Sequence, residues 1–379
     1  MRGFALFVVL LAETAQSAHG FEQATVAQLE QMLTDSREGD SALTARLLQV
    51  QLTQRLLGTG LLRMEQNLRG EKSREALISI ADLSSFLDPA ADEISALPAP
   101  DVDEQRRIVA KVVDYVIGMS HRLPNFFATR SRLRFEDRPM GPAVGDAVAG
   151  VHSPSRLVGK SSTGITYREG QEILDNGSSK TRKTEMEPGL NAWGLFGPVL
   201  SRVLIEASHG KLEFGHWQRI DGKQLAVFRF TVPMEKSSYA VKFCCMPSAV
   251  GFLAPLDRIT AYHGEIAVDP DEGTVVRLAL LADLDHGDLP TLLEEYSQGM
   301  PLSRADILVE YSPVEIGGKS YYCPTRSVTI SRARTVLRQN TGRQRKGTLG
   351  PEKLFINDET FSDYHVFRSE SRILIDSGP

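Results

Sequence analysis

Residues 262–282 read YHGEIAVDPDEGTVVRLALLA. Residues 262–268 alternate between apolar and polar side chains, and residues 274–282 form a second, mainly apolar run. Between the two runs, Asp269 to Gly273 supply the residue types that favour tight turns. The stretch therefore predicts a β-hairpin, and so short a turn requires antiparallel pairing.

Similar strand–turn–strand patterns fill the chain from residue 126 onward. Asp221-Gly222 joins the runs 211–219 and 224–230, and Gly317-Gly318 joins 306–311 to 321–330. Further strands are expected at 130–135, 164–168, 171–174, 239–245 and 363–374. Together these patterns predict about eleven strands in one antiparallel sheet.

A sheet of that size curls, so we expect a half-barrel whose concave face is partly filled by a helix at 195–208. The side chains expected to point into the concave face are apolar: Phe214, Val227, Phe243, Ile266, Val268, Leu278, Leu280, Leu308 and Val328.

The first 125 residues have a different pattern. Residues 1–20 combine Arg2, an apolar run at 4–12 and small residues before Phe21, which is typical of a signal peptide. A buried helix or a membrane anchor is the alternative, but the run is shorter than the roughly 20 residues that span a bilayer. Residues 21–125 have helical periodicity, interrupted at Gly58-Thr59-Gly60.

These patterns predict an α+β protein with three parts. We expect a signal peptide at 1–20, a helical region at 21–125 and an antiparallel half-barrel domain at 126–379. The mature protein is expected to be exported to the periplasm or the extracellular space and to be soluble there.

The three cysteines allow one disulfide in an oxidising compartment. Strand parity favours Cys244 over Cys245 as the partner of Cys323, and Pro324 can shift that register. Three buried, unpaired thiols are an equally good interpretation.

Composition and motifs exclude several functions. The net charge of −5 does not favour nucleic-acid binding. We find no metal-binding histidine pair, no nucleophile–base pair and no phosphate-binding loop, so no catalytic residue, metal site or cofactor is expected. Asp283, Asp285, His286 and Asp288 cluster without the spacing of a calcium loop.

A basic tract follows the predicted strands. Its members are Arg332, Arg334, Arg338, Arg343, Arg345 and Lys346. We expect a mobile loop over 336–356. The alternative is a functional one, in which the basic residues make peripheral contact with anionic lipid head groups.

Two motifs carry a resemblance to a known superfamily. The hairpin 262–278 and the later segment 307–324, with Gly317-Gly318 and Tyr321, resemble the corresponding parts of periplasmic lipoprotein-carrier proteins. The whole chain is also similar to exported bacterial proteins without an assigned activity. The carrier resemblance implies a half-barrel that holds lipid, although the extra helical residues depart from the carriers and no carrier functional residue is placed here.

Two functions follow as expectations. The first is non-catalytic binding of a lipid, a lipoprotein or an apolar peptide in the concave face, since an apolar pocket suits such ligands. The second is a structural or protein-interaction component of the cell envelope whose sheet is a packed core.

Overall fold

The computed structural model describes residues 21–138, 154–175, 188–220, 222–244, 247–248, 251–252, 256–284, 302–341 and 344–366. The expected signal peptide, at residues 1–20, lies outside them. In the described part of the chain, no helix has the length and apolar character needed to cross a membrane.

Six α-helices are described, five of them before the main sheet begins. They are α1 (Val26–Asp35), α2 (Asp40–Leu47), α3 (Gly58–Gln66), α4 (Glu71–Ser84), α5 (Val102–Arg122) and α6 (Pro198–His209). A 3-10 helix, η1, covers Met234–Lys236.

The main sheet is open, antiparallel and ten-stranded. Its order is β5 (Gln171–Asp175), β4 (Arg156–Arg168), β3 (Phe126–Glu136), β17 (Gln344–Val366), β16 (Lys319–Thr341), β15 (Leu302–Ile316), β14 (Val275–Asp283), β13 (Ala261–Val268), β8 (Lys223–Val232) and β7 (Lys211–Ile220). The fold class α+β is therefore confirmed.

Small sheets accompany the large one. They are β12 (Leu256–Ile259) with β9 (Ala240–Cys244) and β6 (Gly189–Leu190), β10 (Pro247–Ser248) with β11 (Gly251–Phe252), and the parallel pair β1 (Glu22–Ala24) and β2 (Val50–Leu52). The predicted strand 239–245 thus belongs to the three-stranded sheet, because β9 pairs with β12 and β6.

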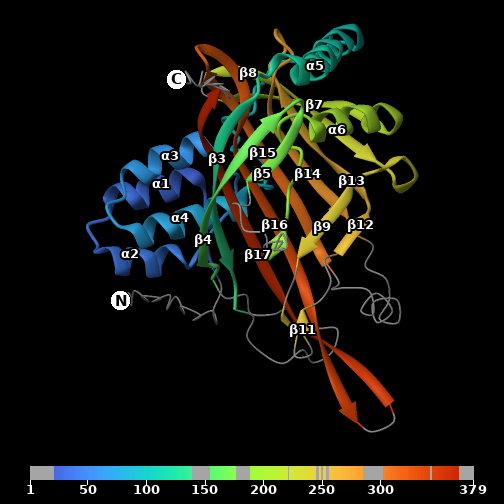
Figure 1. Ribbon diagram of the computed structural model, residues 1–379. Coiled ribbons are helices and arrows are strands. Elements are labelled where there is room, and N and C mark those ends of the chain that lie inside the picture. Colours follow the sequence, from blue (N-terminus) through green and yellow to red (C-terminus); the bar gives the residue numbers. More distant parts are fainter. Residues whose placement is uncertain are drawn as a thin grey trace, which may run out of the picture.

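Helices cover both faces of the main sheet (Figure 1). We call the face towards α6 the inner face and the face towards α1–α4 the outer face. On the inner face, α5 and α6 share a core with Phe228, Ile266 and Leu278. On the outer face, α1–α4 have a core of their own, and Ile78 of α4 also packs against the strands.

Burial of both faces corrects part of the predicted interior. Ile266, Val268, Leu278 and Leu280 lie in the inner core as expected, with Phe214 packed against it. The prediction was wrong for Val227, Leu308 and Val328, which belong to clusters on the outer face. It was also wrong for Phe243, which lies in the small sheet and packs against Phe355 of the main sheet. Strands covered on both sides carry apolar residues at both parities.

The predicted loop at 336–356 is a β-ribbon instead. Pairing of β16 with β17 continues to Thr341 and Gln344. Beyond Ala333 and Phe355, the described residues of β15 and β3 no longer pair with them. Figure 1 shows this two-stranded ribbon projecting from the body of the protein. Backbone pairing, rather than an apolar pattern, organises this segment, so the alternation of side chains gave no signal for it.

Candidate functional site

A row of side chains crosses the outer face at one level of the sheet. Arg277 on β14 pairs with Glu310 on β15, which pairs with Arg326 on β16, and Arg326 pairs with Thr360 on β17. Charges of opposite sign are therefore direct neighbours across three strands, an arrangement that stabilises cross-strand pairs.

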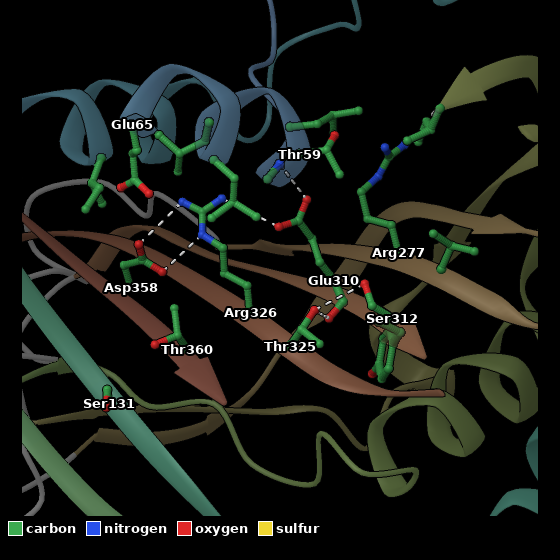
Figure 2. A pocket seen from close by; sticks show the side chains of 18 of the residues that line it. Thr59, Glu65, Ser131, Arg277, Glu310, Ser312, Thr325, Arg326, Asp358 and Thr360 are labelled. Carbon is green, nitrogen blue, oxygen red and sulfur yellow. Dashed lines mark hydrogen bonds and ion pairs between the residues drawn. The ribbon is translucent and has the colours of Figure 1, made fainter. Parts of the chain in front are cut away.

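A cavity of about 430 Å³ lies between this row and α3. Figure 2 shows the charged side chains rising from the strands towards the helix. Most of the cavity wall is apolar, and the apolar residues are Leu57, Leu61, Leu62, Ile78, Leu133, Ile220 and Val276. The volume falls within the range of roughly 300–1,000 Å³ that small-molecule sites occupy.

A β-bulge shapes the β14 end of the cavity. The register between β13 and β14 shifts at Ala267 and Val268, so that Val268 pairs with Val275 and Ala267 with Arg277. Val276 is the extra residue of this bulge, and both Val276 and Arg277 line the cavity. Bulges commonly redirect a side chain in this way beside functional sites.

Glu310 holds the helix that roofs the cavity. Its Oε1 accepts a hydrogen bond from the backbone N–H of Gly58 at 3.1 Å, at the first residue of α3. Leu57, the N-cap residue, provides no side-chain hydrogen bond, so the carboxylate from the sheet takes that role. A carboxylate is also favoured at a helix N-terminus by the helix dipole.

Arg326 is surrounded by acceptors. Its Nη2 donates to Asp82 Oδ1 at 2.5 Å, its Nε donates to Asp358 Oδ1 at 3.1 Å, and its Nη1 lies 3.5 Å from Glu310 Oε2. Burial, together with the charge of Asp358, holds the pKa of Asp82 well above its usual value. Burial also raises the pKa of Asp358. Burial by itself lowers the pKa of Arg326, but the charges of Asp358, Asp82 and Glu310 raise it by more, so that it lies above its usual value.

Arg277 has far fewer partners. Its side chain is 1% exposed, and its Nη2 donates to Gln218 Oε1 at 2.9 Å. Its Nε and Nη1 are buried without a hydrogen-bond partner. Burial, followed by the nearby charge of Arg55, lowers the pKa of Arg277 to about 9, which leaves the group charged at neutral pH.

Arg55 repeats this feature close by. It is 3% exposed, its Nη1 lies 3.8 Å from Glu265 Oε2, and its Nε and Nη2 are buried without a hydrogen-bond partner. Burial lowers the pKa of Arg55 as well. Unpaired buried donors each cost about 1–3 kcal/mol, so two such guanidinium groups are expected to serve a purpose or to be hydrated.

The opposite end of the cavity, near β17, holds Arg326, Asp358 and Glu65. Glu65 of α3 lines it near Asp358, and burial is the main cause of its raised pKa, with the charge of Asp358 adding to the effect. The cavity thus has the unpaired Arg277 at the β14 end, a mainly apolar wall, and near β17 the ion-paired Arg326 with Asp358 and Glu65.

The cysteines expected to pair are not bonded to each other. Cys323 is a free, buried thiol, whereas Cys244 on β9 is disulfide-bonded. A register shift between Glu310 and Tyr311 lies opposite Pro324, beside Cys323. Cys323 packs in the inner core. Cys245 lies outside the described residues.

The basic tract is spread along the ribbon. Arg332 on β16 lies in the body of the sheet, where its Nη1 is 3.5 Å from Glu352 Oε2. Of the other members, Arg334 and Arg338 belong to β16, Arg345 and Lys346 belong to β17, and Arg343 lies outside the described residues. Arg332 does not line the cavity under α3.

The acidic cluster falls largely outside the described part of the chain, which ends at residue 284 in that region. Its described member, Asp283, bonds to His263 Nδ1 at 2.7 Å on the surface. Across the described residues, no group of three potential metal ligands is found.

Sequence reasoning missed the residues that form the cavity. A usable signal was present in β14, whose sequence VVRLALLAD is almost continuously apolar and therefore typical of a strand buried on both faces. Arg277 is the one cation in that strand. Glu310, between Val309 and Tyr311, is a second charge among buried neighbours.

Comparisons with models of known families, with curated proteins and with solved structures give no match for this chain. The function must therefore be argued from the geometry of the site.

Proposed function

We propose that this protein binds a small amphipathic molecule in the cavity between α3 and the outer face of the main sheet. One observation carries the proposal: a mainly apolar cavity of about 430 Å³ ends at a buried arginine with unpaired donors. Apolar walls with a few convergent polar groups are the general character of ligand sites.

This site replaces the concave face as the proposed location. Ile266, Val268 and Leu278 on the inner face are at most 2% exposed, because they are packed in the core that α5 and α6 share with the sheet. A cavity of about 280 Å³ remains beside α6, but its wall includes the polar side chains of Asn191, Lys242 and Asp257. An acyl chain therefore fits the cavity under α3 better.

Chain length gives a direct test of the proposal. Isothermal titration calorimetry with a series of single-chain amphiphiles should show affinity rising by about 0.8 kcal/mol per added methylene until the cavity is full. Affinity should then stop rising. A series without any dependence on chain length, or without binding, would contradict the proposal.

A substitution at the cavity wall tests whether the amphiphile binds in this cavity. Leu62 on α3 lines the cavity and is 60% exposed, so Leu62→Trp should narrow the opening without disturbing the core. The matched control is Ile205→Trp on α6, at a residue that is 61% exposed and does not line this cavity. The first variant should lose at least about tenfold in affinity, equivalent to 1.4 kcal/mol, and the second should bind like the wild type.

The projecting ribbon supports a further part of the proposal, peripheral attachment to an anionic lipid surface after export. Residues 334–352 include five basic residues and one acidic residue, Glu352. Basic groups near such a surface each contribute about 1 kcal/mol. Sedimentation with vesicles should therefore require anionic lipid and should weaken in high salt. Equal sedimentation with neutral vesicles would contradict this part.

A further inference from the structure

We infer that the ligand of this cavity carries an anionic oxygen head group, a carboxylate or a phosphate, which Arg277 receives at the β14 end. The inference rests on the proposed function and adds the chemical class of the ligand and its orientation.

The donors of Arg277 are the first step. A guanidinium has five N–H donors, whereas the structure pairs only Nη2 of Arg277, with Gln218. Nε and Nη1 remain unpaired in a side chain that is 1% exposed and lines the cavity. Figure 2 shows the Arg277 side chain rising from β14 to the side of the sheet on which α3 lies.

The nearby acceptors already have other partners, which is the second step. Glu310, the cross-strand neighbour of Arg277, accepts from Gly58 and pairs with Arg326. The amide of Gln218 donates to Glu93 at 2.8 Å. Glu265 pairs with Arg229 and lies near Arg55. An added acceptor is therefore needed to complete the hydrogen bonds of Arg277.

The sign of the head group is the third step. Arg326 is balanced by two carboxylates in direct contact. Arg277 has no ion pair among the described residues: it is repelled by the charge of Arg55, while the carboxylates of Glu265, Glu310 and Glu93 attract it only from beyond ion-pair distance. An anion would relieve that repulsion and could accept two parallel hydrogen bonds from the guanidinium. A neutral hydroxyl would supply only one weaker acceptor, and an ammonium would be repelled.

The orientation of the ligand follows from the wall. Ile220 and Val276 lie at the Arg277 end, and the leucines of α3 continue the apolar surface away from it. With its head on Arg277, the ligand would extend its chain beneath α3. At the other end of the cavity, Arg326 is already paired with Asp82, Asp358 and Glu310, so it is a poorer partner for an anion than Arg277.

Calorimetry of the complete chain with dodecanoate, dodecyl phosphate and dodecanol tests the inference, each probe being used below its aggregation concentration. In the wild type, at least one of the two anions should bind at least about tenfold tighter than dodecanol, as expected for hydrogen bonds to charged groups. The ratio between the two anions distinguishes a carboxylate from a phosphate ligand. Equal affinity for dodecanol and both anions would overturn the inference and leave the proposed function standing, whereas absence of binding by all three would overturn both.

Variants then assign the selectivity to Arg277. Arg277→Met should lose the preference for the anion, to within about twofold of dodecanol, while it still binds dodecanol. The matched control is Arg229→Met, which removes a cation on β8, two strands away from β14, that is 56% exposed and does not line the cavity. Retained preference in Arg277→Met would overturn the assignment. If that variant does not fold, the head-group comparison in the wild type still decides whether the site selects an anion.

Discussion

The backbone N–H of Gly58 donates a hydrogen bond to the carboxylate of Glu310, a residue 252 positions later in the chain, at 3.1 Å. This contact seats the first turn of α3 on the middle of the main sheet. A Cβ atom at residue 58 would lie 2.7 Å from Glu310 Oε2, so a glycine allows the close approach. The roof of the cavity is therefore fixed at one end by a charged group of its floor.

Removing that carboxylate should loosen α3. We expect Glu310→Ala to lower the free energy of unfolding by about 1.5–3 kcal/mol, since the charged acceptor of the partly buried Gly58 N–H is lost. Hydrogen exchange should accelerate in α3 more than in α1. Urea unfolding gives the free energy, and Glu315→Ala, at an exposed position on the same strand, is the control, expected within about 0.5 kcal/mol of the wild type. Equal losses in the two variants would contradict this role of Glu310.

The ion cluster around Arg326 predicts that removal of this arginine lowers the free energy of unfolding by an amount that depends on pH. Arg326→Met leaves Asp82 and Asp358 buried without their cation, which should cost about 3–5 kcal/mol at pH 7.5. Both carboxyls already have a raised pKa in the wild type, so the folded state binds their protons more tightly than the unfolded state does. Stability from this source is present at low pH and decreases as pH rises through the raised pKa values.

The deficit of Arg326→Met should therefore shrink at pH 5.5, where protonation removes the uncompensated charges. Urea unfolding of both proteins at the two pH values measures it. A variant that also carries Asp82→Asn and Asp358→Asn should recover much of the loss at pH 7.5. A deficit that is equal at the two pH values would contradict the account of the cluster.

Two turn glycines test how closely α5 packs on the sheet. Gly273 and Gly222 have φ values of 72° and 77°, so alanine is strained by about 1–2 kcal/mol at either position. A Cβ atom at Gly273 would lie 2.4 Å from the carbonyl carbon of Lys111 in α5, whereas one at Gly222 meets nothing within 4 Å. Gly273→Ala should therefore cost about 1–3 kcal/mol more than Gly222→Ala in thermal or urea unfolding. Equal costs would show that α5 is not held against the turn.

The free thiol of Cys323 should be unreactive in the folded protein. Burial raises its pKa to about 12, and the thiolate is the reactive species. An alkylating reagent at pH 8 should modify Cys323 only after denaturation, and without any reductant. Peptide mass spectrometry reads the result. If Cys323 is modified only after reduction, it is disulfide-bonded, and the free thiol found in the structure is contradicted.

Local patterns in the sequence predicted much of the sheet. The hairpin expected at 262–268 and 274–282 is found as Ala261–Val268 and Val275–Asp283, because alternation and turn chemistry act between near neighbours. The interruption expected at Gly58-Thr59-Gly60 is the start of α3, and its capping group comes from a distant strand.

The candidate site depends on contacts that no local pattern contains. Arg277, Glu310 and Arg326 become neighbours only when strands pair in the observed register. The bulge at Val276 and the placement of α3 over these strands are tertiary features as well. These side chains come from three separate segments of the chain, so the cavity could not be predicted from spacing.

The ligand proposed for the cavity is an anionic amphiphile that lies beneath α3 with its head on Arg277. Photocrosslinking with a diazirine-bearing dodecanoate, followed by peptide mass spectrometry, tests this placement. We predict adducts within residues 57–65, 276–277 or 310–312, competed by unlabelled dodecanoate and reduced in Leu62→Trp. Adducts confined to the cavity beside α6, at residues 191–202 and 238–242, or to the ribbon at 334–352, would contradict the claim.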